Sequence, residues 1–143
     1  MTVTADPITT EAVRNFVISC AEDLNASLWR SAHSSVIYEG KDSAVVLMDE
    51  FGNMLGQSTG VPLFIGAIDA CVHSVKGYYG DDINEGDVFI MNDSYLQGTH
   101  LHDVTAIWRD FPGRRVGGFG AASAHWGDIG AIDPGSTMQS TNI

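Results

Sequence analysis

Two short segments hold most of the residues that could do metal chemistry. The first, residues 92–103, contains two histidines among polar residues, and the second, residues 124–130, contains one more. Imidazole and carboxylate together suit Zn²⁺, Mn²⁺ or Fe²⁺, whereas all-oxygen ligand sets suit Ca²⁺ or Mg²⁺. The residue types therefore predict a divalent metal site, and we expect its ligands to be His100, Asp103 and His125.

A predicted hairpin would bring the two segments together. Residues 104–108 and 116–122 read as strands, and residues 110–114 have the composition of a turn, with a Pro-Gly pair at its centre. In a hairpin centred on that pair, His100 would lie opposite His125, with Cβ atoms about 5 Å apart. This spacing is short enough for the two imidazoles to share one ion.

The position of Asp103 requires an irregular backbone if this residue is to share the site with His100. Asp103 follows His100 by three residues, and side chains at that spacing in a regular strand point to opposite faces. If both residues are ligands, the chain must bend or bulge between them. Histidines of a surface loop that bind no metal are the alternative interpretation of the same residues.

Length and composition indicate one globular domain over residues 1–143. Hydrophobic residues make up 44% and charged residues 17% of the chain, a balance typical of folded proteins. The net charge of −11 argues against a nucleic-acid partner, because phosphate binding needs clustered Lys and Arg. We also expect no membrane segment and no signal peptide. Cys20 and Cys71 fall on apolar helix faces and are expected to be free thiols in a reducing cytoplasm.

The order of the predicted elements indicates an α+β fold. Apolar residues at spacings of three and four predict a long amphipathic helix over residues 9–32 and a second helix from about residue 65 to residue 77 or 80. Residues 44–48 and 54–57 predict an antiparallel hairpin, and residues 88–91 predict a further strand. The metal site then lies at the end of the second hairpin. The buried stripe of the first helix is expected to be Val13, Phe16, Val17, Cys20, Leu24 and Leu28.

Two long motifs carry a resemblance to a known family. They read Asn92-Asp93-x-Tyr95-x-x-Gly98-Thr99-His100-x-x-Asp103 and Ala124-His125-x-x-Asp128-Ile129-Gly130. With them, the sequence resembles the N-terminal part of the hydantoinase B/oxoprolinase family, which includes subunits of N-methylhydantoinase, 5-oxoprolinase, caprolactamase and the acetone and acetophenone carboxylases. The resemblance covers essentially the whole chain, which corresponds to the first part of a larger family domain.

The resemblance implies ligands, partners and departures from the family pattern. In relatives with a bound metal, the ligands correspond to His100, Asp103 and His125. Family members work with a hydantoinase A-like subunit that binds ATP, and this chain has no Gly-x-x-x-x-Gly-Lys-Ser/Thr phosphate loop. The other implied partners are the remaining hydantoinase B-like polypeptide and a small cyclic amide or ketone substrate. His102 stands where the family mostly has another residue, often proline, and Trp126 replaces a frequent second histidine.

The function implied is that of the metal-binding portion of an ATP-dependent amidohydrolase of the hydantoinase, oxoprolinase or lactamase type. The ion would polarise a carbonyl or phosphoryl oxygen, or lower the pKa of a bound water. Asp128 and Asp93 are the candidate catalytic residues, either as a general base or by orienting a ligand imidazole. An ATP-dependent ketone carboxylase of the acetone or acetophenone type is the alternative within the family.

Two interpretations from other classes stay open. One is a non-catalytic small subunit that only completes an interface. For this subunit, as for the family function, we expect the isolated chain to be inactive. A mononuclear iron oxygenase is the other, because two histidines and one carboxylate also form the Fe(II) facial triad. In such sites the histidine and the carboxylate commonly lie two residues apart on a strand, whereas His100 and Asp103 lie three apart.

Overall fold

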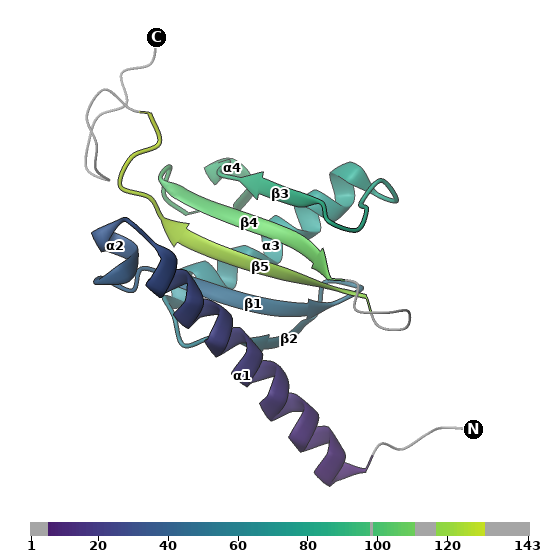
Figure 1. Ribbon diagram of the computed structural model, residues 1–143. Helices are drawn as coiled ribbons and strands as arrows, with labels where there is room; N and C mark the ends of the chain where they lie inside the picture. Colours follow the sequence, from purple (N-terminus) through teal and green to yellow (C-terminus); the bar gives the residue numbers. More distant parts are fainter. Residues whose placement is uncertain (1–5, 98, 111–116, 131–143) are drawn as a thin grey trace.

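The computed structural model describes residues 6–97, 99–110 and 117–130 (Figure 1). In chain order the elements are α1 (Pro7–Ser31), α2 (Ser35–Tyr38), β1 (Ser43–Asp49), β2 (Met54–Gln57), α3 (Pro62–Tyr79), β3 (Val88–Met91), α4 (Ser94–Gln97), β4 (Asp103–Asp110) and β5 (Gly118–His125). The predicted α+β class is confirmed. Most of the predicted turn over residues 110–114 lies outside the described residues.

The five strands form one antiparallel sheet in the order β2-β1-β5-β4-β3. β5 is the last of these strands in the sequence, yet it lies at the centre of the sheet, between β1 and β4 (Figure 1). The predicted hairpin of β1 and β2 is confirmed, and so is the strand over residues 88–91. β1 and β4 are not neighbours, and only β5 joins the two halves of the sheet.

α3 packs against one face of the sheet and forms the hydrophobic core. Its apolar residues recur at helical spacing, so that a single stripe faces the strands. The core residues are Phe64, Ile68, Cys71, Val72 and Val75 of α3 with Ala44, Val46, Met48, Ile83, Ile107, Phe119 and Ala121. The helix begins at Pro62 rather than near residue 65, because proline is favoured in the first turn, where its missing N–H is not needed. It ends at Gly80, whose φ of 54° closes the helix.

α1 lies on the opposite face, where it covers β1 and β2 (Figure 1). A buried polar group fixes it there. Oγ of Ser43 donates to Oδ1 of Asn25 at 2.9 Å and accepts from Nε1 of Trp29 at 2.8 Å. Nδ2 of Asn25 donates to the carbonyl oxygen of Thr59 at 3.2 Å. The helix is therefore tied to the first strand by hydrogen bonds as well as by apolar contact.

The predicted buried stripe of α1 is wrong in its N-terminal half. Val13 is 56% exposed and Phe16 is 70% exposed. The first half of α1 runs past the edge of the sheet, so these side chains have no layer of described residues to pack against (Figure 1). Leu24 is also exposed, and the fully buried residues of α1 are Ala21 and Asn25.

On the α1 side of the sheet, the described helices leave β3 uncovered (Figure 1). Val88 and Ile90 point to this side from β3 and are 61% and 71% exposed. None of the helices in the described residues combines the length and the apolar character needed to cross a membrane. Of the two cysteines, Cys71 is buried and Cys20 is half-buried.

Candidate metal centre

The pairing of β4 with β5 brings Asp103 directly opposite His125. The predicted register, with His100 opposite His125, is wrong by three residues. The physical reason is the length of the connection: β4 continues to Asp110 and β5 begins only at Gly118, so the hairpin centre lies further along the chain than the Pro-Gly pair. Asp103 and His125 therefore sit together at one end of the two central strands.

His100 reaches the same place through a turn that precedes β4. The N–H of Asp103 donates to the carbonyl oxygen of His100 at 3.2 Å, and the N–H of His100 donates to Oδ2 of Asp103 at 2.8 Å. Leu101 and His102 form the turn between them. The predicted bend between His100 and Asp103 is present, and it lets both side chains serve one site.

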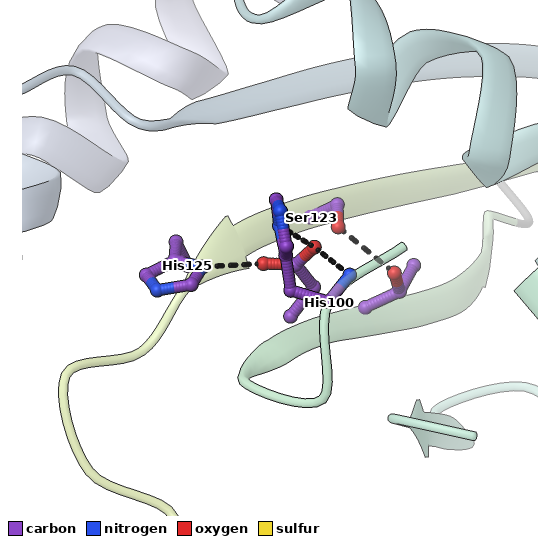
Figure 2. A network of polar contacts seen from close by, with 5 residues as sticks. His100, Ser123 and His125 are labelled. Atoms are coloured by element: carbon purple, nitrogen blue, oxygen red, sulfur yellow. Dashed lines mark hydrogen bonds and ion pairs between the residues drawn. The ribbon is translucent and has the colours of Figure 1, made fainter. Parts of the chain in front are cut away.

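The carboxylate of Asp103 contacts both imidazoles, and these contacts are drawn as dashed lines from the labelled His125 and His100 in Figure 2. Its Oδ1 is 2.6 Å from Nδ1 of His125, and its Oδ2 is 3.2 Å from Nδ1 of His100. Asp103 is fully buried and His125 is 8% exposed, whereas the side chain of His100 is 61% exposed. The site is therefore buried at Asp103 and His125 and exposed to solvent at His100, where a small molecule could approach.

This arrangement fits a divalent cation. One ligand atom from each of His100, Asp103 and His125 lies within 4.8 Å of the other two. Ligands about 2.1 Å from a tetrahedral ion lie roughly 3.4 Å apart, so small side-chain rotations would suffice to hold one. A buried carboxylate also needs a compensating charge. Among the described residues, the ion-pair partners of Asp103 are the two histidines, and a bound cation would supply that charge.

A line of buried polar side chains continues from the site beneath α3. Thr105 and Ser123 are directly paired on β4 and β5, and Oγ1 of Thr105 donates to Oγ of Ser123 at 3.0 Å (Figure 2). Sγ of Cys71 lies 3.7 Å from Oγ1 of Thr105, and burial raises the pKa of this thiol. The sequence reasoning missed Thr105 and Ser123. Their i±2 spacing from Asp103 and His125 was the available signal, because such residues share a strand face.

His102 is a further residue of the site region. It is 7% exposed, and its ring centroid lies 5.8 Å from that of His125. Its carbonyl oxygen accepts from the N–H of Trp126 at 2.9 Å, which fixes the backbone of the turn against the end of β5.

Asp93 and Asp128 hold turns on the exposed surface. Oδ1 of Asp93 accepts from the N–H of Tyr95 at 2.9 Å, and Oδ1 of Asp128 accepts from the N–H of Gly130 at 2.7 Å. Both aspartates are exposed, and neither belongs to the group of close ligand atoms. The other two histidines are also outside it, and His73 lies exposed on α3, 3.6 Å from Oδ1 of Asp69.

The family model for hydantoinase B/oxoprolinase matches residues 6–143. The chain belongs to the hydantoinase B/oxoprolinase family. It is 32% identical to a subunit of a putative D-/L-hydantoinase of Pseudomonas sp. strain NS671, covering 92% of this chain and 23% of the relative. It is 31% identical to 5-oxoprolinase of Saccharomyces cerevisiae, covering 92% of this chain and 10% of that protein. Against the beta subunit of the caprolactamase of Pseudomonas jessenii the identity is 29%, over 92% and 22% of the two chains.

Two solved structures of ATP-dependent enzymes share the fold. Acetone carboxylase in its nucleotide-free form superposes with a TM-score of 0.81 at 22% identity, over 92% of this chain and 18% of that one. The ATP-dependent caprolactamase of Pseudomonas jessenii gives a TM-score of 0.73 at 26% identity, over 92% and 23%. The chain thus spans only 10% to 24% of the length of the curated relatives first matched. The fold thus occurs in an ATP-dependent carboxylase and in an ATP-dependent caprolactamase.

Proposed function

We propose that this chain is the metal-binding portion of an ATP-dependent amidohydrolase of the hydantoinase, oxoprolinase or lactamase type. The observation that carries the proposal is the buried Asp103 carboxylate in contact with both His125 and His100. Family membership supports it, because relatives include a 5-oxoprolinase and a caprolactamase. The substrate is a small cyclic amide.

His100, Asp103 and His125 would hold the ion. Mixed imidazole and carboxylate ligands suit Zn²⁺ or Mn²⁺ and also accept Fe²⁺. When bound, such an ion supplies a Lewis acid for a carbonyl or phosphoryl oxygen, or a more acidic water. The buried pair of Asp103 and His125 fixes the geometry of the site, and exposed His100 leaves one side open to substrate.

Asp128 and Asp93 are proposed as the groups that move a proton or orient a ligand imidazole. Each uses Oδ1 to hold its turn, so Oδ2 can point toward a substrate. Both aspartates follow strands that end near the site, β3 for Asp93 and β5 for Asp128. Loops of this kind commonly carry catalytic groups on a rigid scaffold.

Two protein partners belong to the proposal. The hydantoinase and caprolactamase relatives are each named as one subunit of an enzyme, which supports an assembly in which a hydantoinase A-like chain binds ATP. The remaining hydantoinase B-like polypeptide would cover the open apolar side of β3, where Val88 and Ile90 are exposed. We place the complex in the cytoplasm, a reducing compartment in which disulfides are rare.

Activity of the assembled complex tests the proposal. The protein that carries this chain is purified with its hydantoinase A-like partner, and ATP consumption is measured with hydantoins, 5-oxoproline and caprolactam. We expect ATP-dependent ring opening of one of these amides, and no turnover by the isolated chain. ATP consumption that requires a ketone and bicarbonate would contradict the hydrolase and assign the carboxylase function instead.

Variants of the two exposed aspartates test their proposed roles. Asp128→Asn and Asp93→Asn should lower kcat by about 100-fold or more if the residue transfers a proton, while leaving the metal content unchanged. Glu85→Gln, a change in an exposed loop before β3, is the matched control. Wild-type kcat in both aspartate variants would remove them from the mechanism.

A further inference from the structure

His102 has a buried nitrogen that the described residues leave unused. Its Nε2 is shielded from solvent, and no residue that the structure describes donates to it or accepts from it. Leaving such an atom without a partner costs free energy, and native proteins contain few of them. A nitrogen that is buried, beside a candidate metal centre and without a hydrogen-bond partner among the described residues is available to ligate a metal ion.

The ring of His102 lies close to the candidate metal centre. Its centroid is 5.8 Å from that of His125, and the corresponding distance from His100 to His125 is 5.6 Å. Two imidazoles on one ion, with each nitrogen about 2.1 Å from it, have centroids about 4.6 to 5.6 Å apart. The distance from His100 to His125 is at the upper end of this range and the distance from His102 to His125 is just above it, so the His102 ring must move slightly to share an ion with His125.

The backbone of the turn holds His102 in this position. Its carbonyl oxygen accepts from the N–H of Trp126, and the turn is closed by the N–H of Asp103 donating to His100. The ring nitrogens of His102 lie outside the 4.8 Å group of ligand atoms, so coordination requires a rotation of the side chain. No hydrogen bond from a described residue to Nε2 has to be broken for that rotation.

We propose that His102 is a fourth protein ligand of the metal ion, which makes the site three imidazoles and one carboxylate. The inference rests on the proposed metal-binding function and concerns the composition of the same site. A nitrogen-rich set favours zinc, cobalt, nickel and copper over manganese. Four protein ligands would close a tetrahedral ion, so an ion that takes up substrate here must expand to five ligands or more.

Cobalt(II) is the probe for the test, because its visible absorption changes in intensity and position with the number and kind of ligands. The purified protein is titrated with Co²⁺ as wild type, His102→Ala and His102→Phe, with circular dichroism to confirm folding. We expect both variants to bind Co²⁺ at least 10-fold more weakly and with an altered spectrum. His102→Phe retains the ring volume, so the two variants separate coordination from packing.

Chemical rescue sharpens the result. Free imidazole added to His102→Ala should restore the wild-type cobalt spectrum, which a purely structural role for His102 would not produce. His73→Ala, a change at an exposed histidine on α3, should bind Co²⁺ like the wild type.

The remaining outcomes separate the two proposals. Unchanged affinity and spectrum in both His102 variants, together with lost binding in His100→Ala, would overturn the fourth ligand and keep the three-residue site. Absence of Co²⁺ binding in the wild-type protein would overturn the metal-binding function itself.

Discussion

Asp103 and His125 face each other directly across β4 and β5, with Oδ1 of the carboxylate 2.6 Å from Nδ1 of the imidazole. Both side chains are buried, and the strands that carry them are paired along their whole lengths. His100 is different, because it is exposed and reaches the pair through a turn. The site therefore combines two buried residues with one exposed candidate ligand.

Asp103→Asn should weaken metal binding by about 100-fold or more, because an amide replaces the one anionic ligand of the group. Competition with a chromophoric chelator measures the change in affinity. Asp69→Asn, a change at an exposed aspartate on α3 outside the group, should bind metal as the wild type does. Equal affinity in the two variants would remove Asp103 from the ligand set.

His100→Ala and His125→Ala should each lose most of the metal from the purified protein. Each change deletes one of the three close ligand atoms. His73→Ala should retain the metal, since this histidine lies on α3 beside Asp69. Elemental analysis of the four proteins, wild type included, decides the outcome, and equal metal contents would contradict the site.

Ser43→Ala should lower the free energy of unfolding by about 2 to 4 kcal/mol, because it leaves buried Oδ1 of Asn25 and the indole N–H of Trp29 without their partner. Urea unfolding measures the difference. Ser27→Ala is the matched control on the exposed side of α1, and a change within about 0.5 kcal/mol is expected there. Similar losses in both variants would argue against the buried network.

Two glycines should respond to alanine in opposite directions. The ring of Trp108 lies over its directly opposed residue Gly120, and a Cβ on that glycine would collide with the indole. Gly120→Ala should therefore destabilise the protein by about 1 to 3 kcal/mol. Gly66 lies within α3 with open space around it, so Gly66→Ala should stabilise by about 0.5 to 1 kcal/mol. Thermal unfolding compares the two, and a shift of the same sign in both would contradict this interpretation.

The buried thiol of Cys71 should make stability depend on alkaline pH. Burial raises its pKa above the ordinary value of 9.0, so the unfolded chain ionises first as the pH increases. The contribution of the protonated Cys71 thiol to the free energy of unfolding is therefore fully present below pH 9.0 and is lost as the pH rises through the raised pKa. Urea unfolding at several pH values should show that the free energy of unfolding falls less at alkaline pH in Cys71→Ala than in the wild type.

The two cysteines should also differ in reactivity. In native protein, iodoacetamide should label half-buried Cys20 before buried Cys71.

The residue types and local periodicity were enough to predict the two long helices, the strands and the cluster, but not the short helices α2 and α4 or the pairing. His100, Asp103 and His125 came from ligand chemistry and motif, and α3 came from its apolar spacing. The predicted register was wrong because the alternation of apolar and polar residues specifies which face of the sheet a side chain occupies, but not which residue of the neighbouring strand lies opposite it. Only the true length of the connection, from Asp110 to Gly118, places Asp103 opposite His125.

The predicted buried stripe of α1 was wrong for a related reason. Val13 and Phe16 continue the apolar spacing of the helix, yet the sheet ends before it reaches them. A helical period identifies a candidate face but cannot say how far the opposing layer extends. Asn25, a polar residue, is instead among the most buried positions, because Ser43 and Thr59 satisfy its side chain.

The central place of β5 also governs when the sheet can assemble during synthesis. β1 and β4 have only β5 as a common neighbour, and β5 ends at His125. Until that segment leaves the ribosome, both strands present an open hydrogen-bonding edge to the surrounding solution. Unpaired edges of this kind attract other chains and slow folding that depends on distant contacts. The nascent chain is therefore most prone to aggregation just before its last described strand emerges, and the candidate metal ligands come together at that same moment.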